Sequence, residues 1–221
     1  VDLAGKFNRL TEEARQVVDA ERQALSSGAA ELTSVERVAA RLAEINGFWN
    51  RSQRELSVCA EELKKTVPQS KADIDQTMVQ LNEDFASLNA QLQQLEAALS
   101  AKKEDMEKLS EKSSRVKNEA NAIYMELSDL DPVARSIAEL HAQQDQVKSI
   151  EEQLVASEDK LQSVLAEWDK GVAAGVISQP QMENNQALAE DVTKLIEKAR
   201  KKLAQREKKI EQAIREVEAV H

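Results

Sequence analysis

The feature that most constrains this fold is a run of apolar residues that repeats every seven residues between Pro68 and Pro132. Its first members follow one another at alternating steps of four and three: Ile74, Met78, Leu81, Phe85, Leu88, Leu92, Leu95 and Leu99. The same register continues to Leu130, with apolar residues replaced only at Lys102 and Ser113 and with no glycine or proline inside the run. Such steps align side chains on one face of a helix, so the pattern predicts one continuous helix of about 58 residues.

Composition extends this expectation to the whole chain. Only 5 glycines and 3 prolines occur in 221 residues, so few positions suit the tight turns that sheets and barrels need. Aromatic residues make up 3% and charged residues 32% of the chain, which is otherwise rich in strong helix formers. The sequence therefore predicts an all-α protein.

Four further apolar stripes with helical spacing accompany the long one. They cover residues 3–24, 35–63, 133–168 and 188–217. Together the stripes predict five helices of roughly 26, 33, 58, 39 and 38 residues.

Turn and capping residues predict where these helices begin and end. We expect the first helix to end at Ser26-Ser27-Gly28 and the second to stop at Val67-Pro68, where proline removes a backbone donor. The expected starts are a capping box at Thr33 and Glu36, a cap at Ser70, and Asp131 followed by proline in the first helical position. We expect a loop through Ile177-Ser178-Gln179-Pro180 before the last helix.

The five helices fit together if the long one is two helices joined end to end. Residues 1–100 then form one antiparallel three-helix bundle and residues 101–221 a second, as an elongated rod. The turns support a repeat, because Ser26 and Asp131 open corresponding connections about 105 residues apart, and Pro68 and Pro180 mark connections about 112 apart.

This combination of period, heptads and shared helix resembles the spectrin-repeat family, across the whole chain. Within that family the resemblance favours giant nesprin-like nuclear-anchorage proteins or spectraplakins, and bacterial division proteins with spectrin-like folds match as well. The family has a tryptophan midway along its first helix, where this chain offers Phe7 and Tyr124.

The resemblance implies a structural function. We expect a semi-rigid, force-bearing spacer within a large cytoskeletal linker, cytoplasmic and cytoskeleton-associated. A nesprin-like parent would connect the outer nuclear envelope or organelles to actin through other parts of its chain. We expect a monomeric rod. The alternative is a helical docking scaffold or a membrane-associated helical dimer.

Charge and residue types argue against several other functions. The net charge of −10 repels nucleic acid and anionic lipid over most of the surface, and no apolar stretch is long enough to insert into a membrane. The spacing of His141 and Asp145 suits part of a zinc site, but no second His or Cys stands near them. Cys59 lies on an apolar stripe and is expected to be buried. We therefore expect no metal, no cofactor and no enzymatic activity.

One charged feature stands out as a candidate site. The last helix contains a basic cluster within an otherwise acidic chain, comprising Lys198, Arg200, Lys201, Lys202, Arg206, Lys208, Lys209 and Arg215. Pairing with acidic neighbouring helices is one explanation. The other is a docking stripe for an acidic partner such as actin or anionic lipid, with Lys198, Lys201, Lys202, Arg206, Lys208 and Lys209 as the candidate contacts.

The aromatic residues of the predicted second and fourth helices are expected to pack in the core. Trp49 lies on the apolar stripe, Phe48 flanks it, and Trp168 would close the end of the second bundle. Gly47 could allow close approach of two helices or mark a bend.

Overall fold

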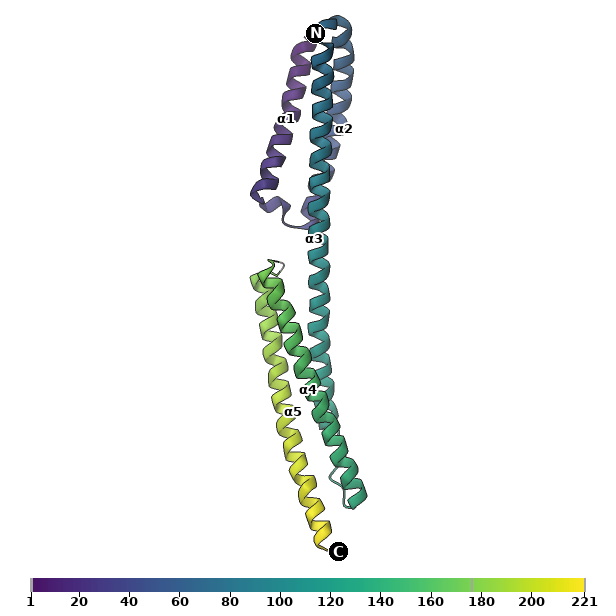
Figure 1. The fold of residues 1–221 in the computed structure, drawn as a ribbon, viewed down its shortest axis with the longest axis vertical. Helices are drawn as coiled ribbons and strands as arrows, with labels where there is room; N and C mark the ends of the chain where they lie inside the picture. Colours follow the sequence, from purple (N-terminus) through teal and green to yellow (C-terminus); the bar gives the residue numbers. More distant parts are fainter. Residues whose placement is uncertain (1, 176, 221) are drawn as a thin grey trace. The chain divides into compact units, whose positions relative to one another are not determined.

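The structure is a computed structural model that describes residues 2–175 and 177–220, of which Glu31 is described without its side chain. The described residues form five α-helices and two short 3₁₀ helices and contain no strand (Figure 1). In order these are α1 Leu3–Ser27, η1 Ala30–Leu32, α2 Val35–Thr66, η2 Pro68–Ser70, α3 Lys71–Ser128, α4 Ile137–Ala173 and α5 Gln179–Ala219. The prediction of an all-α chain is confirmed.

The long helix predicted from the apolar run is also confirmed. α3 contains 58 residues and passes without a break through Lys102, the position where the apolar stripe is interrupted. This helix belongs to both compact units of the chain, because the N-terminal unit ends at Lys102 and the C-terminal unit begins at Lys103. The sequence had placed that boundary between residues 100 and 101.

Two predicted helix starts are wrong in the N-terminal unit. Ser34, not Thr33, caps α2: its Oγ accepts the backbone N–H of Arg37 at 3.2 Å, and its backbone is extended. The Thr33 hydroxyl instead donates to the carbonyl of Ala30 at 2.8 Å, which closes η1. Likewise Ser70 does not cap α3 but donates to the carbonyl of Val67 at 2.6 Å, because the chain enters α3 through η2.

The predicted ends of α1 and α2 are confirmed. Gly28 follows Ser27 with φ of 63°, a left-handed conformation that glycine adopts without steric cost. α2 ends at Thr66, directly before Val67-Pro68.

The start predicted for α4 at Asp131-Pro132 is wrong. α4 begins at Ile137, with Ser136 as its cap. The Gln143 side chain donates to the carbonyl of Pro132 at 2.9 Å and accepts the N–H of Ala134 at 3.0 Å, so it holds the preceding segment in a non-helical path.

The connection before α5 is shorter than predicted. α4 continues through Gly171 to Ala173, and Gly175 adopts a φ of 71°. Ser178 and Gln181 form a capping box, so Gln179 and Pro180 already belong to α5. Proline fits there because the first helical turn has backbone donors without intrahelical partners.

The N-terminal unit has its own apolar core between α1, α2 and the first part of α3. Its buried residues are Phe7, Leu10, Ala14, Val18, Leu32, Val38, Ile45, Leu56, Cys59, Ala60, Leu63, Ile74, Leu81, Phe85, Leu88 and Leu92. Trp49 is half-buried and stacks on Phe85, with ring centroids 4.3 Å apart and planes 5° from parallel. Phe48 approaches the same ring at 6.1 Å.

The C-terminal unit has a second core between the last part of α3, α4 and α5. Its buried residues are Val116, Ala120, Ile123, Leu127, Leu140, Val147, Ile150, Leu154, Leu161, Val164, Trp168, Ile177, Val192, Ile196, Ala199, Leu203 and Ile210. Each core therefore contains residues of three α-helices, and α3 contributes residues to both cores.

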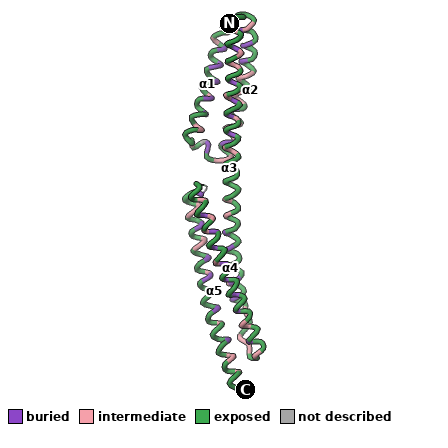
Figure 2. Tube along the Cα trace, viewed as in Figure 1, coloured by how far each residue is buried: buried purple, intermediate pink, exposed green. Residues whose placement is uncertain are grey.

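Along α3, between the parts that supply these two cores, a stretch has no buried residue (Figure 2). Leu92 is the last buried residue of α3 in the N-terminal unit and Ser113 the first in the C-terminal unit. Leu95, Leu99, Met106 and Leu109 are half-buried and continue the apolar stripe. All six residues from 100 to 105 are exposed.

Candidate functional site: the basic residues of α5

The basic cluster predicted from the sequence lies on one long helix whose inner face is apolar. In α5 the buried residues Val192, Ile196, Ala199, Leu203 and Ile210 follow one another at helical spacing and face the core. The charged residues between them therefore lie on the flanks of α5 or on the face turned away from the core.

Three of the basic residues are engaged within the C-terminal unit. Lys202 Nζ donates to Ser128 Oγ at 3.1 Å and lies 4.6 Å from the centre of the Tyr124 ring, a cation–π contact. Arg206 donates to the carbonyl of Asp131 at 2.7 Å. Arg200 forms an ion pair with Glu158 of α4. These contacts attach α5 to α4, to the end of α3 and to the segment after it.

The structure thus divides the six predicted contact residues into two groups. Lys202 and Arg206 hold the fold together. The remaining four, Lys198, Lys201, Lys208 and Lys209, are exposed and make no ion pair with any described residue. Only this second group has charges that are available to a partner.

Sequence reasoning missed one member of the exposed group. Lys194 is also exposed and precedes Lys201 by seven residues. With Lys208 and Arg215 it completes a series of cations at seven-residue intervals, and that spacing is the signal that would have found it.

A buried polar cluster lies elsewhere in the C-terminal unit, where the sequence showed only an interruption of the stripe. Trp168 Nε1 donates to Ser113 Oγ at 2.9 Å, and the Ser113 hydroxyl lies 3.0 Å from the carbonyl of Leu109. Asn185 Oδ1 lies 3.5 Å from the same hydroxyl. All three polar side chains are buried, so Ser113 occupies a core position because it accepts the indole N–H.

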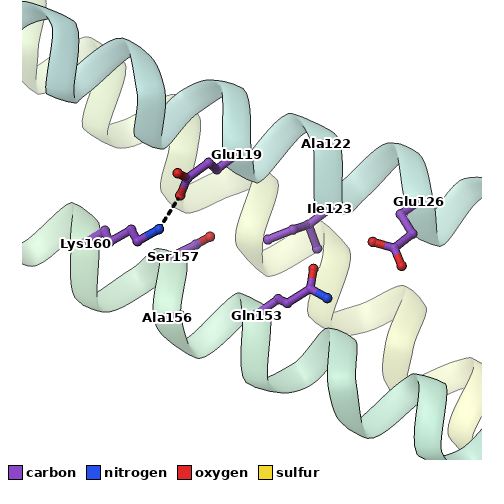
Figure 3. A pocket seen from close by; sticks show the side chains of 8 residues that line it. All are labelled: Glu119, Ala122, Ile123, Glu126, Gln153, Ala156, Ser157 and Lys160. Carbon is purple, nitrogen blue, oxygen red and sulfur yellow. Dashed lines mark hydrogen bonds and ion pairs between the residues drawn. The ribbon is translucent and has the colours of Figure 1, made fainter.

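The surface of the C-terminal unit contains two shallow grooves. One, of about 260 Å³, is lined by the buried polar cluster together with Met106, Gln181 and Leu188. The other, of about 290 Å³, lies between α3 and α4 (Figure 3). There the small side chains of Ala122 and Ala156 leave room, and an ion pair of 2.8 Å between Lys160 and Glu119 lies at one end.

The described acidic, histidine and cysteine side chains form no metal-binding group. Within the described part of the chain, no group of three or more His, Cys, Asp or Glu side chains is placed to hold a metal ion. Cys59 is buried and its Sγ lies 3.4 Å from the carbonyl of Leu3. Burial raises the pKa of this thiol, the nearby Lys6 opposes the shift and Glu62 adds to it. The thiol is therefore held in its protonated, unreactive form.

Among residues 2–175 and 177–220, no helix combines the length and the apolar character needed to cross a bilayer.

No model of a known protein family matches the sequence. A search of curated proteins finds no significant match either.

Proposed function

We propose that this chain is a structural segment of a larger cytoskeletal linker, made of two spectrin-like three-helix bundles that share α3. The observation that carries the proposal is the pair of separate apolar cores, both supplied by one unbroken helix. An arrangement of this kind suits a spacer, because a continuous helix transmits force between the units while each unit keeps its own core.

The two cores determine how such a spacer would respond to load. Each core is closed by residues of its own unit, so one unit can unfold while the other stays folded. The helices also provide length, since 58 residues of α3 at 1.5 Å per residue extend for about 87 Å. The proposed role is therefore an elongated, semi-rigid spacer that lengthens in steps under tension.

The resemblance to nesprin-like and spectraplakin proteins suggests the cellular setting of this proposal. In it, the segment belongs to a cytoplasmic tether between the nuclear envelope or other organelles and actin. The binding ends of the tether lie in other parts of the parent chain.

A docking scaffold is the second candidate function. The observation that favours it is the group of exposed lysines on α5, Lys198, Lys201, Lys208 and Lys209, whose charges are not neutralised by other described residues. Reversal of these charges should then abolish capture of an acidic partner without altering the mechanical response.

Stretching single molecules between handles at both ends tests the spacer proposal. The units contain roughly 100 and 120 residues, so we expect two unfolding events, each releasing on the order of 300 Å of chain. Leu56→Ala in the first core and Ile150→Ala in the second are matched variants, because both side chains are fully buried. Each should lower the force of one event only. A single event that releases the whole chain, or gradual extension without events, would contradict the proposal.

A further inference from the structure

The outward face of α5 carries a regular charge pattern that the spacer function does not use. Alternating steps of four and three residues lead from Glu183 to Arg215, and every residue on this path is exposed. Those steps trace one line along a helix, as they do for the buried stripes. This line, opposite the apolar face of α5, contains eight charged residues and two alanines, Ala187 and Ala204.

The charges on this line separate into two adjacent edges. The acidic edge is formed by Glu183, Glu190, Glu197 and Glu211. The basic edge is formed by Lys194, Lys201, Lys208 and Arg215. Residues on each edge are seven apart or a multiple of seven, which is about 10.5 Å or a multiple of it along the helix.

None of these eight side chains forms an ion pair within the described part of the chain. Neighbours along α5, such as Glu190 and Lys194, have the spacing for an intrahelical pair but do not close to 4 Å. Both edges are therefore open to charges from outside the molecule.

We propose that the outer face of α5 binds the same face of a second copy of this chain, with the two helices antiparallel. In an antiparallel pair related by a two-fold axis, residues whose numbers have the same sum lie opposite each other. An axis at the level of Ala199 places Glu183 opposite Arg215, Glu190 opposite Lys208, and Glu197 opposite Lys201.

This arrangement places six of the eight charged residues of the line opposite a residue of opposite charge. Each opposition occurs twice because the interface is symmetric. The other oppositions, Lys194 with Ala204 and Ala187 with Glu211, place no like charges together. A parallel pair in register would instead set every charge against its own copy, so the pattern selects the antiparallel orientation.

The composition of the face favours this occupant over the other partners of a basic surface. The line offers no aromatic or large apolar side chain for insertion into a bilayer. Its acidic edge repels anionic lipid and phosphate at the positions where a second copy is complementary. The dimer departs from the monomer expected from the sequence.

Exposed ion pairs are individually weak, so the association should be weak and strongly dependent on salt. Screening sets the conditions of the test, because the Debye length falls from about 30 Å at 0.01 M salt to about 3 Å at 1 M. We expect sedimentation equilibrium of the full chain to show a reversible dimer at low salt and a monomer at 1 M salt.

Two charge-reversed proteins identify the surface. One carries Glu183→Lys, Glu190→Lys and Glu197→Lys, and the other carries Lys201→Glu, Lys208→Glu and Arg215→Glu. Each alone presents like charges to its copy and should lose self-association by at least tenfold. An equimolar mixture should recover it as a mixed dimer.

The control makes the same change of net charge as the first reversed variant, at positions outside α5. Glu12→Lys, Glu55→Lys and Glu107→Lys replace three exposed glutamates that have no partner among the described residues. This control should dimerise like the parent, and circular dichroism should show equal helicity in all the proteins.

Three outcomes would overturn the proposal. They are a parent that stays monomeric at low salt, reversed variants that dimerise as the parent does, and a mixture that does not associate. Pelleting of the monomer with phosphatidylserine vesicles, without self-association, would likewise reject the second copy in favour of a membrane.

Discussion

The hydrogen bond between Trp168 and Ser113 should contribute measurably to the stability of the C-terminal unit. Ser113 is 3% and Trp168 4% exposed, so both side chains are largely withdrawn from water. Ser113→Ala removes one oxygen atom and leaves the indole N–H unpaired in the core. The expected loss is about 1–3 kcal/mol, which is the usual cost of an unsatisfied buried donor.

A double-mutant cycle isolates this hydrogen bond from the other effects of the substitution. Trp168→Phe removes the donor, while the Ser113 hydroxyl keeps the carbonyl of Leu109 as its acceptor at 3.0 Å. In that background Ser113→Ala should cost no more than about 0.5 kcal/mol, so the coupling energy should be about 0.5–3 kcal/mol. Ser114→Ala, at the exposed neighbouring position, is the control and should stay within about 0.5 kcal/mol of the parent.

Urea unfolding followed by circular dichroism at 222 nm gives all four stabilities. The indole N–H resonance of Trp168 provides a direct readout, since its exchange with solvent should be slow in the parent and faster after Ser113→Ala. Equal costs of Ser113→Ala in both backgrounds would refute the reasoning, because the serine would then act without the indole.

Three further predictions concern the N-terminal unit. Trp49→Ala should destabilise the N-terminal unit by about 2–3 kcal/mol in thermal unfolding. This is less than for a fully buried tryptophan, because the ring is only half-buried where it stacks on Phe85. A variant that melts like the parent would exclude the stacking. Gly47→Ala should stabilise the unit by about 0.5–1 kcal/mol, since the new Cβ would approach nothing closer than 3.5 Å. Gly28→Ala should destabilise the unit, because the φ of 63° is unfavourable for alanine. Equal effects of the two substitutions would contradict this argument from backbone conformation. Burial raises the pKa of the Cys59 thiol, so the thiol should stay protonated to higher pH in the folded protein than in the unfolded protein. Folded protein should therefore react with Ellman's reagent at pH 8 far more slowly than protein in urea. Equal rates would refute the burial of the thiol.

The sequence predicted the interiors of the helices better than their ends. The length of α3 followed from uninterrupted steps of three and four and from the lack of a helix breaker. Thr33 and Ser34, in contrast, are adjacent residues that can both cap a helix, and the path of the chain through η1 decides between them. Ser136 and Glu139 have the spacing of a capping box, so the start of α4 has a local signal that the Asp131-Pro132 prediction overlooked. The non-helical path before it depends on Gln143, which lies later in the chain.

The same distinction applies to the candidate site. Charge density along α5 identified the helix but not the face on which each cation lies. Lys202 was counted as a contact for a partner, although its ammonium group lies against Tyr124 and Ser128. Those two residues belong to α3, so their proximity is a product of tertiary packing. The seven-residue spacing of Lys194 and Lys201 could be read from the sequence, whereas the absence of ion pairs could not.

The stretch of α3 without buried residues has a consequence for the hydrogen exchange of the backbone. At the six exposed positions from 100 to 105 the amides are protected only by the helix itself, aided by local contacts such as the 3.0 Å ion pair of Lys108 with Glu104. Opening of these six residues removes no side chain from either core, so it requires much less free energy than unfolding a unit. Exchange along α3 should therefore be slow in two stretches and fast between them, although the helix has no break in its geometry.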